Sequence, residues 1–168
     1  MKEGILILAV CAALASCADA PVAEPFLLPE NVYGAFAGVA PEIESRLAEE
    51  AVRHLARLYP PAETLLDFQQ EIGDGDGFGQ ALLRAAQVDG YVIRRNHVPG
   101  TPPRCGRKPA PRKDGETRHP VPACYLVDGV GGWLRLTLYV AGDVWSRLFA
   151  GEAGGLRPAG AWTHWSER

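Results

Sequence analysis

Residues 133–140 read Trp-Leu-Arg-Leu-Thr-Leu-Tyr-Val, and this stretch decides the fold class. One set of alternate positions is aliphatic: Leu134, Leu136, Leu138 and Val140. The positions between them are mixed: Trp133, Arg135, Thr137 and Tyr139. Successive side chains of a strand point to opposite faces. The pattern therefore predicts an antiparallel strand with one face on the core and one toward solvent.

The segments around this strand predict further strands joined by tight turns. Gly129 to Gly132 predicts a turn that leads back to a strand over Ala123 to Val127. On the other side, Gly142-Asp143 predicts a turn into a strand over Val144 to Phe149. After a glycine-rich loop, Ala161 to Trp165 is expected to add an edge strand. The C-terminal half is therefore expected to be a sheet.

The N-terminal half has a helical period. From Pro41 to Tyr59 an apolar stripe recurs at spacings of three and four, and Pro60-Pro61 ends it. The stripe is Ile43, Leu47, Ala51, Leu55 and Leu58. His54 lies beside the stripe, and we expect it at the helix border rather than as a ligand.

A second helix is expected between two strands. Thr64 to Ile72 is interpreted as a strand, Phe78 to Val88 as the helix, and a strand begins at Tyr91. Asp89-Gly90 ends the helix, because glycine adopts the left-handed cap conformation readily. The sequence thus predicts an α+β fold, with two helices packed on a mostly antiparallel sheet of about four to five strands.

The run Gly73-Asp74-Gly75-Asp76-Gly77 invites functional interpretations that its details exclude. Counted from Asp74, the fifth and twelfth positions of a calcium loop hold Phe78 and Ala85, which offer no side-chain oxygen. A phosphate loop would place two carboxylates against an anion. We therefore expect a turn in which Asp76 caps the following helix.

The N-terminus has the features of a bacterial lipoprotein signal. Gly4 to Ser16 is an uncharged run of 13 residues, shorter than the roughly 20 that span a membrane. Leu14-Ala15-Ser16-Cys17 resembles a lipobox, so Cys17 is the expected acceptor of a diacylglycerol and an N-acyl chain such as palmitate. An ordinary signal peptide cut near Ala20 remains the alternative. Ala18, which is not Asp, implies sorting to the outer membrane.

The chain is therefore divided into three parts. Residues 1–16 are the expected signal peptide and 17–36 the lipidated N-terminus and tether, in which prolines recur among small residues. Residues 37–168 form one α+β periplasmic domain, which contains a basic, proline-rich insertion at 96–121. Residues 94–118 carry eight Lys/Arg and two Asp/Glu, although the whole chain has net charge −3. This insertion is expected to be solvated or to meet an acidic protein. DNA contact is a further possibility, but specific nucleic-acid binding is not expected.

Two cysteines remain after the signal region, Cys105 and Cys124. In an oxidising periplasm a disulfide between them is the favoured prediction. Free thiols and a metal site with His97 and His119 are the alternatives. The spacing matches no compact zinc pattern, so no metal is expected.

No catalytic motif is present, so the chain is expected not to be an enzyme and to use no cofactor. The four tryptophans fall in the last 36 residues, two of them near arginines. Core packing is their default role, but Trp and Arg also dominate binding hot spots. The candidate partner-binding residues are Trp133, Arg135, Trp145, Arg147, Trp162 and Trp165.

Several segments, taken in order, resemble the TrbH family of conjugal transfer lipoproteins. The specific ones are Leu58-Tyr59-Pro60-Pro61-Ala62 and Pro158-Ala159-Gly160-Ala161-Trp162. Weaker ones include Tyr33-Gly34-Ala35-Phe36 and Phe78-Gly79. The basic insertion and the aromatic ending Trp162-Thr163-His164-Trp165 depart from the pattern expected of the family.

The resemblance implies an outer-membrane lipoprotein of a conjugative type IV secretion (mating-pair formation) apparatus. Such a protein is expected to act in assembly or stabilisation of the channel, with TrbG-type and TrbI-type proteins as partners. The alternative is a generic envelope lipoprotein that binds a small ligand or peptidoglycan.

Overall fold

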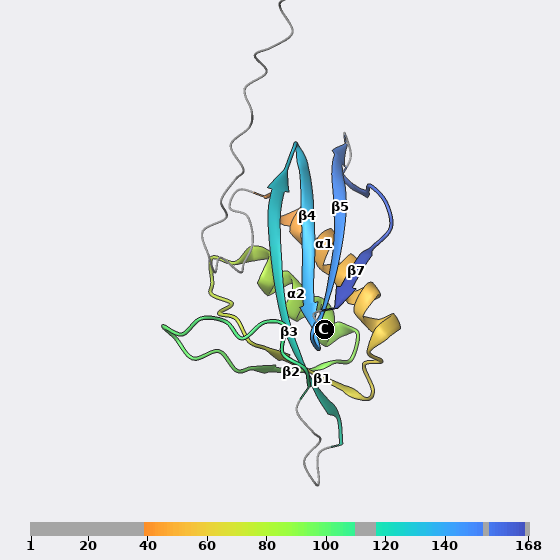
Figure 1. The fold of residues 1–168 in the computed structure, drawn as a ribbon. Coiled ribbons are helices and arrows are strands. Elements are labelled where there is room, and N and C mark those ends of the chain that lie inside the picture. The colour runs from red at the N-terminus through yellow and green to blue at the C-terminus, as the bar shows by residue number, and fades with distance from the viewer. Residues whose placement is uncertain (1–38, 110–116, 153–154, 167–168) are drawn as a thin grey trace, which may run out of the picture. The chain divides into compact units, whose positions relative to one another are not determined.

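The computed structural model describes residues 39–109, 117–152 and 155–166, which belong to one compact unit. Both helices lie on one face of the sheet (Figure 1). The helices are α1 (Pro41–Leu58) and α2 (Gly77–Val88). The strands are β1 (Thr64–Phe68), β2 (Val92–Arg95), β3 (His119–Val130), β4 (Trp133–Val140), β5 (Asp143–Glu152), β6 (Gly155–Pro158) and β7 (Thr163–Ser166).

The α+β class is confirmed, but the predicted four to five strands are too few. The described residues form a 7-stranded sheet in the order β2-β1-β3-β4-β5-β6, and β7 also pairs with β5. β1 runs parallel to both β2 and β3, and the other pairs are antiparallel. The parallel half arises because α2 carries the chain back between β1 and β2, so that β2 starts at the same end of the sheet as β1.

β3 begins earlier than the sequence predicted, inside the residues assigned to the insertion. Pro120 and Pro122 lie within this strand. His119 N donates to Glu63 O, and Ala123 O accepts from Gln69 N, so odd-numbered residues bond toward β1. The missing N–H groups of the prolines would point to the other side, where Val140, the last residue of β4, pairs with Ala123. Pro122 O still accepts from Ala141 N just past β4, so the prolines cost the sheet no bond within β4 itself.

Other predicted strand boundaries differ as well, and one strand was not predicted. The strand expected over Thr64 to Ile72 ends at Phe68, and the strand expected over Ala161 to Trp165 is Thr163–Ser166. β6 lies in the segment interpreted as a glycine-rich loop. Short edge strands that contain glycine have little alternating pattern, which is why the sequence did not show β6.

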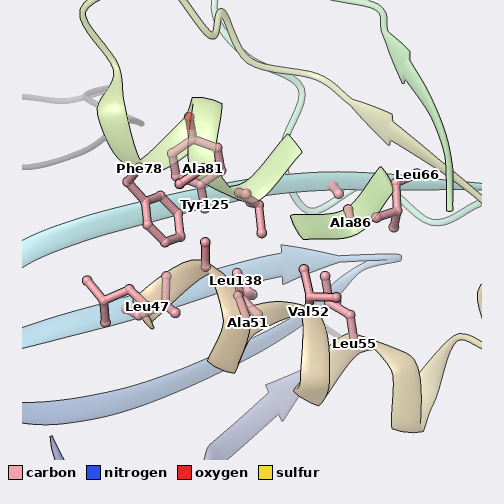
Figure 2. Close-up of a cluster of buried hydrophobic side chains, with 14 of the residues drawn as sticks. Leu47, Ala51, Val52, Leu55, Leu66, Phe78, Ala81, Ala86, Tyr125 and Leu138 are labelled. Atoms are coloured by element: carbon pink, nitrogen blue, oxygen red, sulfur yellow. The ribbon is translucent and has the colours of Figure 1, made fainter. Parts of the chain in front are cut away.

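The core lies between the helices and the sheet. Leu47, Ala51 and Leu55 of α1 are buried against α2 and the middle strands, as the helical stripe predicted. Figure 2 shows Tyr125 and Leu138 of the sheet facing Phe78 and Ala81 of α2. Leu58, at the end of the stripe, is 37% exposed because the helix ends there.

The start of α2 is fixed by the expected aspartate cap. Asp76 Oδ1 accepts from Gly79 N at 2.8 Å, and its Oδ2 accepts from the hydroxyl of Tyr125. Burial and the Asp76 carboxylate raise the pKa of Tyr125, so the hydroxyl keeps its proton and remains a donor. Gly90 ends the helix at φ +92°, as predicted.

Candidate partner-binding surface

The structure places the six candidate residues on two opposite faces of the sheet, five of them by strand alternation and Trp162, in a loop, by its contact with His54. Opposite partners share a face: Trp145 and Arg147 pair with core leucines, whereas Arg135 and Trp165 pair with Asp128 and Val144. On the helix side lie Trp145, Arg147 and Trp162, and on the open side lie Trp133, Arg135 and Trp165. The six residues therefore do not form one surface.

The helix-side residues join an aromatic stack, made of Trp162, His54, Trp145 and His164. His54 of α1 stacks on Trp162 at 4.2 Å between ring centroids and an interplanar angle of 13°. Trp145 meets His54 edge-on at 4.8 Å and stacks on His164 at 4.0 Å. These four rings tie α1 to β5 and β7, so most of this stack is structural packing.

Arg147 lies beside the Trp162 end of the aromatic stack. Its guanidinium pairs with Glu50 of α1 at 3.3 Å and donates from Nε to Gly160 O at 2.8 Å. It also lies 6.0 Å from the centroid of the Trp162 ring. These contacts hold Arg147 against α1 and leave it little freedom to meet a partner.

His54 is buried, which differs from the expected helix-border position. Its side chain is 8% exposed, and Nε2 has no hydrogen-bond partner among the described residues. Burial, together with the positive charges of Arg57 and Arg147, lowers the pKa of His54 to about 4. The ring is therefore neutral in the folded protein at neutral pH.

Acidification from pH 7 to pH 5 is expected to destabilise the domain through His54 by about 2 kcal/mol. The unfolded chain takes up a proton near the ordinary pKa of 6.5, whereas the folded chain resists protonation down to about pH 4. Stability contributed by the neutral ring is thus lost as pH falls through this window. Urea denaturation at both pH values measures the change.

His54→Phe is the matched control for this pH effect. Phenylalanine preserves the ring between Trp162 and Trp145 but has no titrating nitrogen. The variant is expected to lose less stability than the wild type on acidification, by the same 2 kcal/mol or so. An equal pH dependence in both proteins would contradict the assignment.

The open side of the sheet carries an apolar groove, which we call the open-face groove. It measures about 550 Å³, and its lining includes Val130, Arg135, Arg147, Leu148, Trp165 and residues 159–161. Leu148 is 38% and Trp165 49% exposed, and Trp133 at the β3–β4 turn is 44% exposed. Arg135 donates two hydrogen bonds to the Asp128 carboxylate, from Nε to Oδ1 at 3.0 Å and from Nη2 to Oδ2 at 2.5 Å. The groove combines exposed aromatic area with a fixed guanidinium, the composition of protein-binding hot spots.

The insertion is fastened to this same open side. A disulfide joins Cys105 to Cys124, with Cα atoms 5.5 Å apart, and Cys124 is 1% exposed. Gly106 and Lys108 approach Gly142 at the β4–β5 turn. No group of three or more His, Cys, Asp or Glu residues suited to a metal occurs within residues 39–109, 117–152 and 155–166.

A comparison with protein families identifies the chain. The model of the family described as conjugal transfer protein TrbH matches residues 30–166. The chain belongs to the TrbH family. No curated protein and no solved structure matches it.

The TrbH match spans every described helix and strand, including both faces of the sheet. The candidate lipid acceptor Cys17 precedes the matched range. Cys17 and the signal and tether segments 1–16 and 17–36 lie outside the described residues. Within the described part of this TrbH chain, no helix is long and apolar enough to cross a membrane.

Sequence reasoning missed the part that His54 and Glu50 play in this TrbH domain. The two lie four residues apart on α1, so they share a face that meets β5. Their spacing was a usable signal, but only the fold shows that tryptophans and Arg147 cover this face.

Proposed function

We propose that this TrbH-family chain is an outer-membrane lipoprotein of a conjugative type IV secretion apparatus that helps to assemble or stabilise the channel without catalysis. The observation that carries the proposal is the family match over residues 30–166. The lipobox-like Leu14-Ala15-Ser16-Cys17 before that range supports the membrane anchor.

Lipid on Cys17 would confine the domain to a membrane surface. Confinement raises its effective concentration for partners in the same membrane without any added contact. The proline-containing segment 17–36 would provide reach between the anchor and the domain. These properties suit a protein that holds channel components together.

The open-face groove is the surface that we assign to these partners, with TrbG-type and TrbI-type channel proteins as the occupants. Leu148 and Trp165 expose apolar area there, and Trp133 exposes more at the β3–β4 turn. Trp145 and Trp162, in contrast, are committed to the aromatic stack. Exposed aromatic residues around a fixed arginine favour a protein partner over a small polar ligand.

Site-specific photo-crosslinking tests the proposal in cells that carry the conjugation apparatus. A photo-crosslinking amino acid placed at Leu148 in the groove is expected to capture a TrbG-type or TrbI-type protein. The matched control places it at Glu49, an exposed residue on α1. Cys17→Ser in the Leu148 background is expected to abolish capture, because the domain is no longer held at the membrane.

Two outcomes would contradict the proposal. Equal capture at Leu148 and Glu49 would remove the groove as the docking surface. The second outcome has three parts: the protein fractionates with the outer membrane, it captures no channel protein, and DNA transfer survives deletion of its gene. That result would favour a generic envelope lipoprotein. A search for a small ligand or peptidoglycan contact would then follow.

A further inference from the structure

The two edges of the sheet differ in whether another strand covers them. At one end β6 and β7 together cover the outer edge of β5. At the other end β2 is the last strand in the order, and it is only four residues long. Asn96 N donates to Phe68 O on the β1 side, so the backbone groups of Ile93 and Arg95 point away from the sheet. No described residue pairs with them through its backbone.

A hollow of about 330 Å³ lies beside this free edge, between α2 and β2. Its lining is Gln80, Leu83, Arg84, Gln87, Ile93 and Arg95. The α2 members are spaced three, one and three residues apart and so occupy a single helix face. Ile93 and Arg95 are alternate residues of β2 and so point to the same side of the sheet. The hollow therefore lies where the side chains of an added strand would project.

The charge of the hollow is positive and is not compensated by its own lining. Its polar side chains are two guanidinium groups and two amides, with no carboxylate among them. On the opposite face of β2, Arg94 pairs with Asp67 at 2.8 Å. Arg84 and Arg95 form no ion pair with any carboxylate in the described parts of the chain. Two arginines that have no acidic partner among the described residues, beside a free strand edge, are a site for carboxylates supplied from outside.

We propose that the β2 edge binds an extended acidic segment of a partner protein, which adds a strand beside β2 and places carboxylates in the hollow against Arg84 and Arg95. The outward backbone groups of Ile93 and Arg95 would bond the added strand. A residue directly opposite Arg95 has its side chain on the same face, within reach of the guanidinium. Acidic residues at alternate positions of the segment therefore fit the edge.

The same charges argue against a second copy of this chain at the edge. Two β2 strands paired with each other would bring Arg94 and Arg95 of both copies together, and like charges opposite one another destabilise a sheet. The basic residues of the neighbouring insertion, Arg104, Arg107 and Lys108, add positive potential that favours an acidic partner.

The test uses the full chain in a non-ionic detergent at physiological salt. The probe is a fluorescein-labelled peptide, Thr-Glu-Val-Glu-Val-Glu-Thr, and binding is followed by fluorescence anisotropy. Saturable binding is expected, and Arg84→Gln with Arg95→Gln is expected to weaken it by at least about tenfold. Arg104→Gln with Arg107→Gln removes the same charge outside the hollow and is expected to change affinity by less than about threefold. Chemical-shift mapping on the wild-type chain does not depend on how the variants fold. The peptide is expected to shift the backbone amide signals of Leu83 and Ile93.

Control probes separate strand addition from simple charge attraction. A peptide with the same glutamates but N-methylated backbone amides is expected to bind at least about tenfold more weakly, because it lacks ladder donors. Equal binding of that peptide, or equal weakening by the two double variants, would overturn the proposal. It would also be overturned if a single-stranded oligonucleotide displaced the peptide and lost affinity in the Arg84→Gln, Arg95→Gln variant, since the site would then bind nucleic acid.

Discussion

Replacing Gly79 with alanine is expected to lower the free energy of unfolding by about 3 kcal/mol. A Cβ at this position would collide with the Tyr125 hydroxyl and lie 2.6 Å from Asp76 Oδ2 and 2.7 Å from Ile72 Cγ2. Tyr125 is fully buried and Ile72 is 6% exposed, so neither side chain has room to move aside.

The expected size follows from three opposing effects. Overpacking a core costs about 1–3 kcal/mol, and disturbing the hydrogen bond from Tyr125 to the Asp76 carboxylate costs about 1.5–3 kcal/mol. Alanine regains about 1 kcal/mol through its higher helix propensity within α2. The net effect should lower the melting temperature by roughly 10 °C, which thermal unfolding measures.

Gly75→Ala is the matched control, because nothing lies within 4 Å of a Cβ at that position. It is expected to change stability by less than about 0.5 kcal/mol. Tyr125→Phe removes the hydroxyl that a Cβ at residue 79 would strike, so Gly79→Ala should cost clearly less in that background. Equal costs in the two backgrounds would show that the collision is not the cause.

Removing the disulfide with Cys105→Ala and Cys124→Ala is also expected to destabilise the domain by about 3 kcal/mol. The bond joins residues 19 apart in the chain and closes a proline-rich loop with little core of its own. Without the bond the unfolded chain gains conformations, while the folded insertion loses its fastening to the buried β3 strand. Urea denaturation monitored by tryptophan fluorescence measures the loss.

A reductant provides the control for this second effect. Dithiothreitol should destabilise the wild type by a similar amount and leave the double-alanine variant unchanged. A wild type whose unfolding midpoint is unaffected by the reductant would contradict a stabilising disulfide.

The sequence predicted well where a pattern is local. The alternation over 133–140 corresponds to β4, the stripe over 41–59 corresponds to α1, and Asp76 caps α2 as expected. In each case the deciding contacts are made by residues a few positions apart, or by one face of one element against a core. The parallel pairing of β1 with β2 and β3 was not predicted, because no local signal states which distant strand lies beside another.

The candidate binding residues show the same limit. Composition singled out the tryptophans and arginines near the C-terminus, but register separated them onto two faces. Trp145 and Trp162 became packing partners of His54, whereas Trp133 and Trp165 remained exposed. A shift of one residue in pairing would exchange these roles, so the sequence alone could not assign them.

By itself the sequence determined the α+β class, the approximate centres of both helices and of every strand except β6, and the resemblance to the TrbH family. It could do so because hydrophobic periodicity, caps and motifs lie in consecutive residues. Only the tertiary structure decided the mixed strand order, the burial of His54, the groove on the open face and the arginine-lined hollow beside β2. Those features depend on pairings between residues far apart in the chain, where packing and register decide which side chains meet and which stay exposed.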